Sequence, residues 1–278
     1  MSPAPLPSAF DAYIDSAGIP KFQHSCVLFW DIVGVRTFSR SGQALPRLVA
    51  LSTALNAARA RAGFEDNASG AHSIHAVTWF TDCVGVGTPV VGAVGVEQAL
   101  GYTAIGASYL QLLLLDASFL GRGGIAFGLH HMQDQLVYGP ALIDAVDLEK
   151  ETRWPRVALT PEAAEHNREV VRAYYADPQD SPHAEQYLVD EEDNAVFVDP
   201  LGAWLSEEDD ESVANQLLHR QRGIIESALA RETGEPYRKW KWLADMHNHV
   251  LGRLPLFHPH RIDAGAPQHS FRSFISTV

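Results

Sequence analysis

Two aspartates, Asp31 and Asp82, each follow a short apolar segment at the point where a β-strand gives way to a turn. A carboxylate that closes a buried strand costs free energy unless it is paired or binds a cation. If the two strands are neighbours, both carboxylates reach one point, and such oxygen ligands suit Mg²⁺ or Mn²⁺ together with substrate phosphates. The pattern indicates a two-metal site for phosphoryl chemistry. It leaves open the alternative that Asp31 caps a turn at Gly34 and Asp82 serves a hairpin turn.

The two strands are predicted from apolar, β-prone runs. Residues 26–33 form the first run, which Gly34 ends. Residues 75–80 and 84–87 predict a hairpin with Asp82 at its tip. Alternation of side chains places two sets of residues on shared faces, Val27 with Phe29 and Asp31, and Thr78 with Phe80 and Asp82.

The remaining elements are predicted from periodicity and from breaker residues. Helices are predicted over 44–61, 93–120 (closed by Gly121) and 140–150, and strands over 124–129, 135–138 and 156–159, followed by a helix capped at Thr160. Residues 176–192 are acidic and predicted to be irregular, and two helices are predicted beyond them over 211–231 and 236–251. The order β-α-β-β-α-β-β-α-β predicts an α+β fold with a ferredoxin-like βαββαβ core. We expect a catalytic domain over 1–200, with its core at 24–160, and a helical extension over 201–278 packed on it.

Composition limits the classes of partner. The chain has 278 residues, 46% of them hydrophobic and 20% charged, with a net charge of −13. These values are typical of a globular protein, and the acidity argues against broad binding to nucleic acid or to an anionic membrane. Much of the acidity lies between Asp177 and Glu211, which indicates a solvated segment.

Location is predicted from cysteine use and from hydropathy. The two cysteines, Cys26 and Cys83, lie in apolar strands and are expected to be buried free thiols in a reducing compartment. Residues 1–8 lack the charge and apolar core of a signal peptide. Polar residues interrupt the most apolar stretch, 93–120, so a buried helix is favoured over a membrane span. We therefore expect a soluble, cytoplasmic protein.

The motifs together resemble one enzyme family. Asp31-Ile32-Val33-Gly34 after an apolar strand, and Phe80-Thr81-Asp82 in a hairpin, are similar to the class III nucleotidyl cyclases. Arg122-Gly123-Gly124-Ile125-Ala126-Phe127-Gly128 resembles that family's next core strand, and Tyr138-Gly139-Pro140-Ala141 through Glu149 resembles the segment after that strand. The match covers residues 26 to about 160 in the right order. Its motifs are specific in combination and weak one by one.

The resemblance implies a role for each matched residue. Asp31 and Asp82 would bind two Mn²⁺ or Mg²⁺ ions, with the backbone carbonyl of Ile32 as a third ligand. The amides of Gly34, Val35 and Arg36 would hold the terminal phosphates of a nucleoside triphosphate, and Phe29 and Thr78 would line the substrate site. The substrate's own 3′-hydroxyl would attack the α-phosphorus, so the reaction needs no dedicated protein base. The family also implies a homodimer whose active sites lie at the subunit interface.

Departures from the family pattern concern the base and the transition state. Purine-specific members carry a lysine and a polar residue at the positions of Thr78 and Leu136, and an asparagine and an arginine at those of Ile143 and Asp147. A positive charge must then come from elsewhere. Arg122 is the first candidate and Arg36 the second, although Arg122 could equally be a structural ion-pair partner.

These departures fit a branch that the chain resembles more closely, the pyrimidine cyclases of the bacterial Pycsar antiphage system. The similarity lies in the start of the helix at Gly139-Pro140-Ala141-Leu142-Ile143-Asp144-Ala145 and in the late Trp242-Leu243 and His247-Asn248 pairs. It implies cyclic UMP, or less often cyclic CMP, made as a signal for a separate effector. UTP is favoured over CTP on family frequency alone.

Three other functions stay open. The chain could be a non-catalytic nucleotide-binding module on a decayed cyclase fold, or it could be a purine cyclase. A diguanylate-cyclase-like enzyme is disfavoured because the hairpin lacks a Gly-Gly-Asp/Glu-Glu-Phe-like signature. Histidines offer no metal motif: His130-His131 is predicted to lie in a loop, and His247 and His249 are expected to be surface or capping residues.

Overall fold

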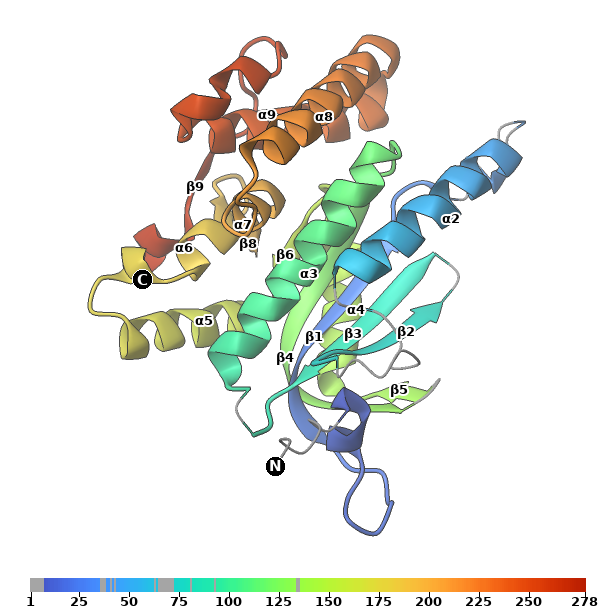
Figure 1. Cartoon of the computed structure of the whole chain (residues 1–278), viewed down its shortest axis with the longest axis vertical. Coiled ribbons are helices and arrows are strands. Elements are labelled where there is room, and N and C mark those ends of the chain that lie inside the picture. The colour runs from blue at the N-terminus through green and yellow to red at the C-terminus, as the bar shows by residue number, and fades with distance from the viewer. Residues whose placement is uncertain are drawn as a thin grey trace.

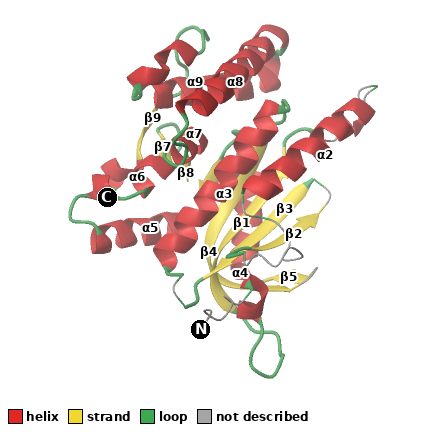
Figure 2. Cartoon of the chain, in the orientation of Figure 1, coloured by secondary structure: helices red, strands yellow, loops and turns green. Residues whose placement is uncertain are grey.

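The computed structural model describes residues 8–35, 39–40, 42, 44–62, 64, 73–80, 82–92, 94–133 and 136–278. It is a mixed α+β structure in which one large sheet carries helices (Figures 1 and 2). The strands are β1 (Gln23–Ile32), β2 (Ala76–Phe80), β3 (Cys83–Pro89), β4 (Gly121–Gln133), β5 (Leu136–Tyr138), β6 (Val157–Leu159), β7 (Tyr187–Asp190), β8 (Val196–Val198) and β9 (Phe271–Ser273). The helices are α2 (Ala44–Arg61), α3 (Val96–Asp116), α4 (Pro140–Glu151), α5 (Pro161–Tyr174), α6 (His183–Gln186), α7 (Pro200–Leu205), α8 (Glu211–Arg231) and α9 (Gly234–Gly252), besides short 3₁₀ turns.

The strands lie in the order β2-β3-β1-β4-β6-β8-β7-β9, and β5 pairs with β4. β1 is antiparallel to both of its neighbours, β3 and β4, and β4 is parallel to β6. The predicted α+β class and the predicted chain order from β1 to β6 agree with these elements. Asp31 therefore lies near the end of a central strand that is flanked on both sides.

The two faces of β1 enter different packing layers. Cys26, Leu28, Trp30 and Ile32 belong to the main core, which α2 and α3 cover. Val27 packs with Ala141 and Ala145 of α4 on the opposite face, and Phe29 packs against the same cluster. The predicted alternation along β1 is confirmed, and it places Asp31 on the face that α4 covers (Figure 1).

The C-terminal third of the chain extends the sheet as well as adding helices. α8 and α9 lie close to their predicted bounds, and Trp242 of α9 joins Trp154 and Phe197 in a second core. The prediction that residues 176–192 are irregular is wrong, because they contain α6 and β7. β9 then returns from the far end of the chain to pair with β7. The domain division near residue 200 stays a prediction.

Asp190 explains why the acidic segment enters the sheet. Its carboxylate is fully buried and accepts hydrogen bonds from Arg156, at 2.5 Å, and from the indole nitrogen of Trp242, at 3.0 Å. A buried carboxylate needs such partners, and here they come from residues 34 and 52 positions away in the chain. Local composition could not reveal them.

Helix α3 and strand β4 correct two further predictions. α3 ends at Asp116 rather than at residue 120, and Gly121 begins β4 instead of closing the helix. A Cβ at Gly121 would lie 1.9 Å from the Trp30 ring, so this glycine serves the packing of β1 against β4. β4 continues to Gln133, so His130 and His131 lie in a strand and not in a loop.

Several histidines are core residues. His130 is fully buried and His247 is almost fully buried, so the expectation of a surface or capping role for His247 is wrong. Burial lowers the pKa of His130 to about 4 and that of His247 to about 3, which keeps both rings neutral.

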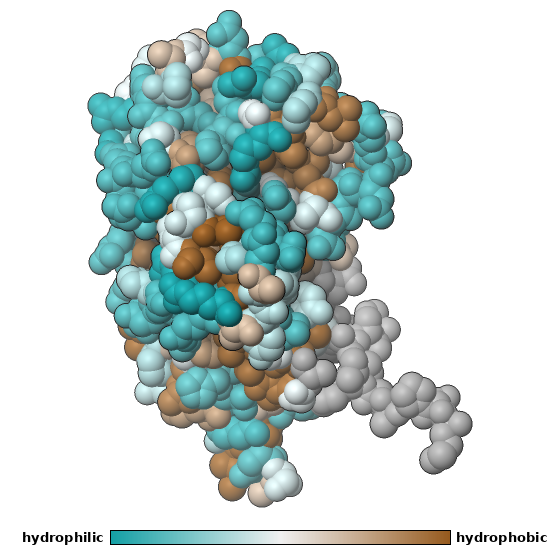
Figure 3. Space-filling view, turned by 90° about the vertical axis from the view of Figure 1, so that its left-hand side faces the viewer, coloured by the Kyte–Doolittle hydropathy of each residue, from teal (hydrophilic) through white to brown (hydrophobic). Residues whose placement is uncertain are grey.

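No helix among the described residues is long and apolar enough to cross a bilayer. Figure 3 shows one face of the molecule, on which hydrophilic residues prevail and apolar residues gather in smaller groups.

Candidate metal and phosphate site

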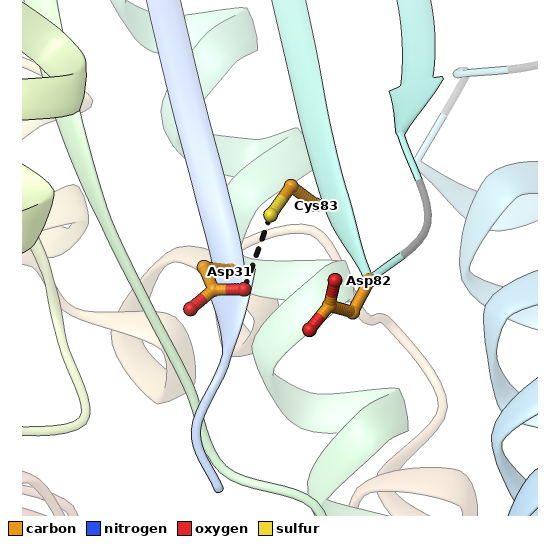
Figure 4. Close-up of side chains that lie close together, drawn as sticks. All are labelled: Asp31, Asp82 and Cys83. Atoms are coloured by element: carbon orange, nitrogen blue, oxygen red, sulfur yellow. Dashed lines mark hydrogen bonds between the residues drawn. The ribbon is translucent and has the colours of Figure 1, made fainter. Parts of the chain in front are cut away.

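The two aspartates lie close together where β1 ends and β3 begins, as predicted. Asp31 lies directly opposite Cys83 in the β1–β3 ladder and opposite Arg122 in the β1–β4 ladder. Asp82 immediately precedes β3. One ligand atom from each of Asp31, Asp82 and Cys83 lies within 4.8 Å of the others (Figure 4). This spacing fits a cation held between the carboxylates.

The electrostatics of this cluster also fit a cation. Burial raises the pKa of Asp31, and the neighbouring charge of Asp82 raises it further, whereas the Cys83 thiol and Arg122 act in the opposite direction. The Cys83 Sγ donates a hydrogen bond to Asp31 Oδ1 at 3.1 Å. Two half-buried carboxylates that repel each other gain from a shared positive charge.

Cys83 is a member of the site that sequence analysis missed. Burial and the nearby carboxylates raise the pKa of its thiol well above the ordinary value. The sulfur therefore stays protonated and orients Asp31 by its hydrogen bond, which leaves the carboxylate oxygens as the ligands that Mg²⁺ or Mn²⁺ prefers. The signal in the sequence was its position beside Asp82, at the first residue of a strand.

The turn after β1 lies next to the carboxylates. Ile32 is the last residue of β1 and pairs with Gly121, and the Val33 amide donates to the Leu120 carbonyl at 2.8 Å. Gly34 has a φ of +85°, a left-handed conformation that favours glycine. Val35 comes at the end of this described stretch, whereas Arg36 lies outside the described residues. The roles predicted for the Ile32 carbonyl and for these amides stay predictions.

Arg122 is anchored to the end of α4. Its Nε lies 2.6 Å from Glu149 Oε1, and its Nη1 donates to the Thr152 carbonyl at 3.2 Å. The ion pair left open as an alternative is therefore present. The Arg122 side chain is 28% exposed. Burial raises the pKa of Glu149, as it raises that of Asp31, and the charge of Arg122 acts in the opposite direction on both. Its catalytic role stays a prediction, and Glu149 joins the site as a partner that sequence analysis did not assign.

The proposed base-side residues occupy one row across the sheet. Thr78 lies opposite Gly85, and Gly85 lies opposite Phe29, so the three share a face with Asp31 in the adjacent row. Thr78 is buried and Phe29 is half-buried. Their roles as substrate-binding residues stay predictions, and their place on the same face as Asp31 is consistent with those roles.

The substituted positions on β5 and α4 are exposed. Leu136 and Ile143 each expose more than half of their surface. Asp147 forms a surface ion pair with Lys150 at 3.1 Å. None of these three side chains supplies a positive charge to the site.

The comparisons with known proteins leave the family open. Neither a protein-family model nor a curated protein matches the chain. Among solved structures, the adenylyl cyclase CyaB from P. aeruginosa is similar over 64% of this chain and 93% of its own, with a TM-score of 0.42 and 16% identity. A likeness this distant carries no weight for function.

Proposed function

We propose that this chain is a nucleotidyl cyclase that converts a nucleoside triphosphate, UTP in preference to CTP, into the 3′,5′-cyclic nucleotide and pyrophosphate. One observation carries the proposal: the carboxylates of Asp31 and Asp82 converge at the end of a central strand, directly before a glycine turn. Two divalent ions, Mn²⁺ or Mg²⁺, are the cofactors that this pair would hold.

The reaction needs few protein groups. The 3′-hydroxyl oxygen forms a bond to the α-phosphorus, and its proton passes to water. The bond from the α-phosphorus to the oxygen that bridges the α- and β-phosphorus atoms breaks, so that pyrophosphate leaves. Divalent cations, when bound, would acidify the hydroxyl and offset the phosphate charge. Asp31 and Asp82 would hold these cations in place. Cys83 orients Asp31, and Arg122 adds positive charge beside Asp31.

The sheet topology supports this proposal. The four strands nearest the site run in the order β2-β3-β1-β4, and each neighbouring pair is antiparallel. With α2 and α3 as the two connections, this order supports the ferredoxin-like βαββαβ core that the resemblance to class III cyclases implies. The resemblance and the site geometry thus favour the same chemistry.

The preference for a pyrimidine over a purine base rests on Thr78 and Leu136. A buried threonine and an exposed leucine stand where purine-specific members carry a lysine and a polar residue. The resemblance to the pyrimidine branch implies a pyrimidine substrate and a cyclic UMP signal that activates a separate effector in antiphage defence.

A homodimer is supported by two apolar surface patches, one on α2 and one on β5 and α4. Leu45, Leu48 and Val49 of α2 are each more than half exposed, and so are Tyr138 and Ile143 on β5 and α4. Burying both patches would favour association of two copies. Leu48→Glu, measured by sedimentation, is expected to shift a wild-type dimer to monomer and to lower turnover with it, whereas a monomeric wild type would contradict the proposal.

The proposed function is tested by incubating the protein with Mn²⁺ and each of the four ribonucleoside triphosphates and resolving the products by mass. Cyclic UMP or cyclic CMP with pyrophosphate supports the proposal. Cyclic AMP or cyclic GMP would keep the chemistry and overturn the interpretation of Thr78 and Leu136.

A second candidate is a non-catalytic nucleotide-binding module. The observation that favours it is the absence of an asparagine and an arginine at two positions of α4, where Ile143 is apolar and Asp147 is paired with Lys150. Tight binding of a triphosphate without release of pyrophosphate would establish it in place of the cyclase.

A further inference from the structure

A cavity of about 270 Å³ opens where the turn after β1 faces the C-terminal helices. Its walls include Val33, Gly34, Arg47, Arg231, Lys239 and Trp240. Small-molecule sites span roughly 300–1,000 Å³, so this volume suits part of a ligand, such as a phosphate chain, better than a whole nucleotide. The cavity adjoins the glycine turn that comes after Asp31.

The acidic groups at this cavity are already engaged. Glu232 accepts a hydrogen bond from Arg231 at 3.0 Å. Glu235 lies 3.6 Å from Arg153 and 3.3 Å from Arg238. Arg47 donates to the Ser118 carbonyl at 3.3 Å, and its guanidinium lies 5.2 Å from the centre of the Phe119 ring.

Lys239 differs from these groups. Within the part of the chain that the structure describes, its Nζ forms neither a hydrogen bond nor an ion pair. Burial lowers its pKa, the charges of Arg122 and Arg153 lower it further, and Glu235 acts in the opposite direction. A half-buried ammonium that lies among other cations and whose N–H groups donate no hydrogen bond is suited to bind an anion.

Arg122 links this lysine to the carboxylates. It lies opposite Asp31 in the sheet, and its charge acts on both Asp31 and Lys239. The turn of Val33 and Gly34, which follows Asp31 in the chain, lines the same cavity as Lys239.

The resemblance implies that the turn at Gly34 holds the terminal phosphates, and we propose that Lys239 of α9, on the wall of the same cavity, supplies a direct cationic contact to those phosphates and to the pyrophosphate product. The inference rests on the proposed function and deepens it. It gives the C-terminal helices a part in the site, and it adds a positive charge that Ile143 and Asp147 of α4 do not supply.

Binding of inorganic tripolyphosphate and of pyrophosphate, measured by calorimetry with Mn²⁺ present, tests the proposal without turnover. Lys239→Gln is expected to weaken binding by about tenfold or more, because it removes a charge-assisted hydrogen bond. Lys21→Gln, which removes the same charge at an exposed position, serves as the matched control and is expected to bind like wild type. Equal binding by wild type and Lys239→Gln, with both folded by circular dichroism, would overturn the inference.

The outcomes separate this inference from the cyclase proposal. If wild type forms a cyclic nucleotide and Lys239→Gln has unchanged KM and unchanged inhibition by pyrophosphate, Lys239 does not contact the phosphates although the enzyme is a cyclase. If wild type forms no cyclic nucleotide and tripolyphosphate binding still depends on Lys239, the phosphate site stands and the cyclase reaction fails.

Discussion

Gly124 sets how closely α4 approaches the sheet beside the site. A Cβ at this position would lie 2.2 Å from the Ala145 carbonyl oxygen and 3.1 Å from Leu148 Cβ. Ordinary contacts begin at 3.4 Å, so Gly124→Ala forces α4 to move by about 1.2 Å. Overpacking of this kind costs about 1–3 kcal/mol of unfolding free energy.

Gly128 provides a matched control on the same strand and the same face. A Cβ there would lie 3.5 Å from Ala141 Cβ, an ordinary contact. Gly128→Ala is expected to leave stability unchanged or to raise it by up to about 1 kcal/mol, since alanine restricts the unfolded chain. Urea denaturation of both variants measures the difference. Equal stabilities would refute the close approach of α4 to β4.

Three further predictions concern the core and the site. Lys241→Met leaves the nearly buried Asp245 without its 2.5 Å partner and should lower the unfolding free energy by about 3–5 kcal/mol in urea, and a loss below about 1 kcal/mol would contradict the buried pair. Burial lowers the pKa of His75 to about 4, so the unfolded chain takes up a proton near pH 6.5 that the folded chain refuses. His75 alone should therefore cost about 3 kcal/mol of stability between pH 6.5 and pH 4, beside the losses that buried His130 and His247 cause in the same direction. His75→Gln should reduce the slope by that share in denaturation at several pH values, and an unchanged slope would refute this assignment. Cys83→Ala should weaken Mn²⁺ binding by about tenfold in calorimetry and Cys83→Ser should restore it, whereas equal affinities would show that the hydrogen bond to Asp31 does not matter.

The meeting of Asp31 and Asp82 could be predicted because it depends on local patterns. An apolar run with period-two alternation predicts β1, and two β-prone segments around Asp82 predict the hairpin. Because the two strands are neighbours, their ends bring the two carboxylates together. The helices α8 and α9 were predictable for a similar reason, since each carries its own 3.6-residue periodicity.

Other features depend on contacts between distant residues. The buried carboxylate of Asp190 has Arg156 and Trp242, both far away in the chain, as its partners. The sequence predicts that Gly121 ends a helix. In the structure this glycine leaves room for the ring of Trp30 on the neighbouring strand. Lys239 is one of several charges in its segment, and only tertiary packing brings it to the same cavity as the turn after β1. Such long-range pairs leave no local signal.

The most direct test of the metal-dependent cyclase is Asp82→Ala, assayed with UTP and CTP in the presence of Mn²⁺. Asp263→Ala, at an exposed position, is the matched control. The account predicts that Asp82→Ala forms cyclic nucleotide at least about 100-fold more slowly than wild type while Asp263→Ala is unaffected. Turnover by Asp82→Ala at the wild-type rate would contradict the role of the paired carboxylates and, with it, the proposed function.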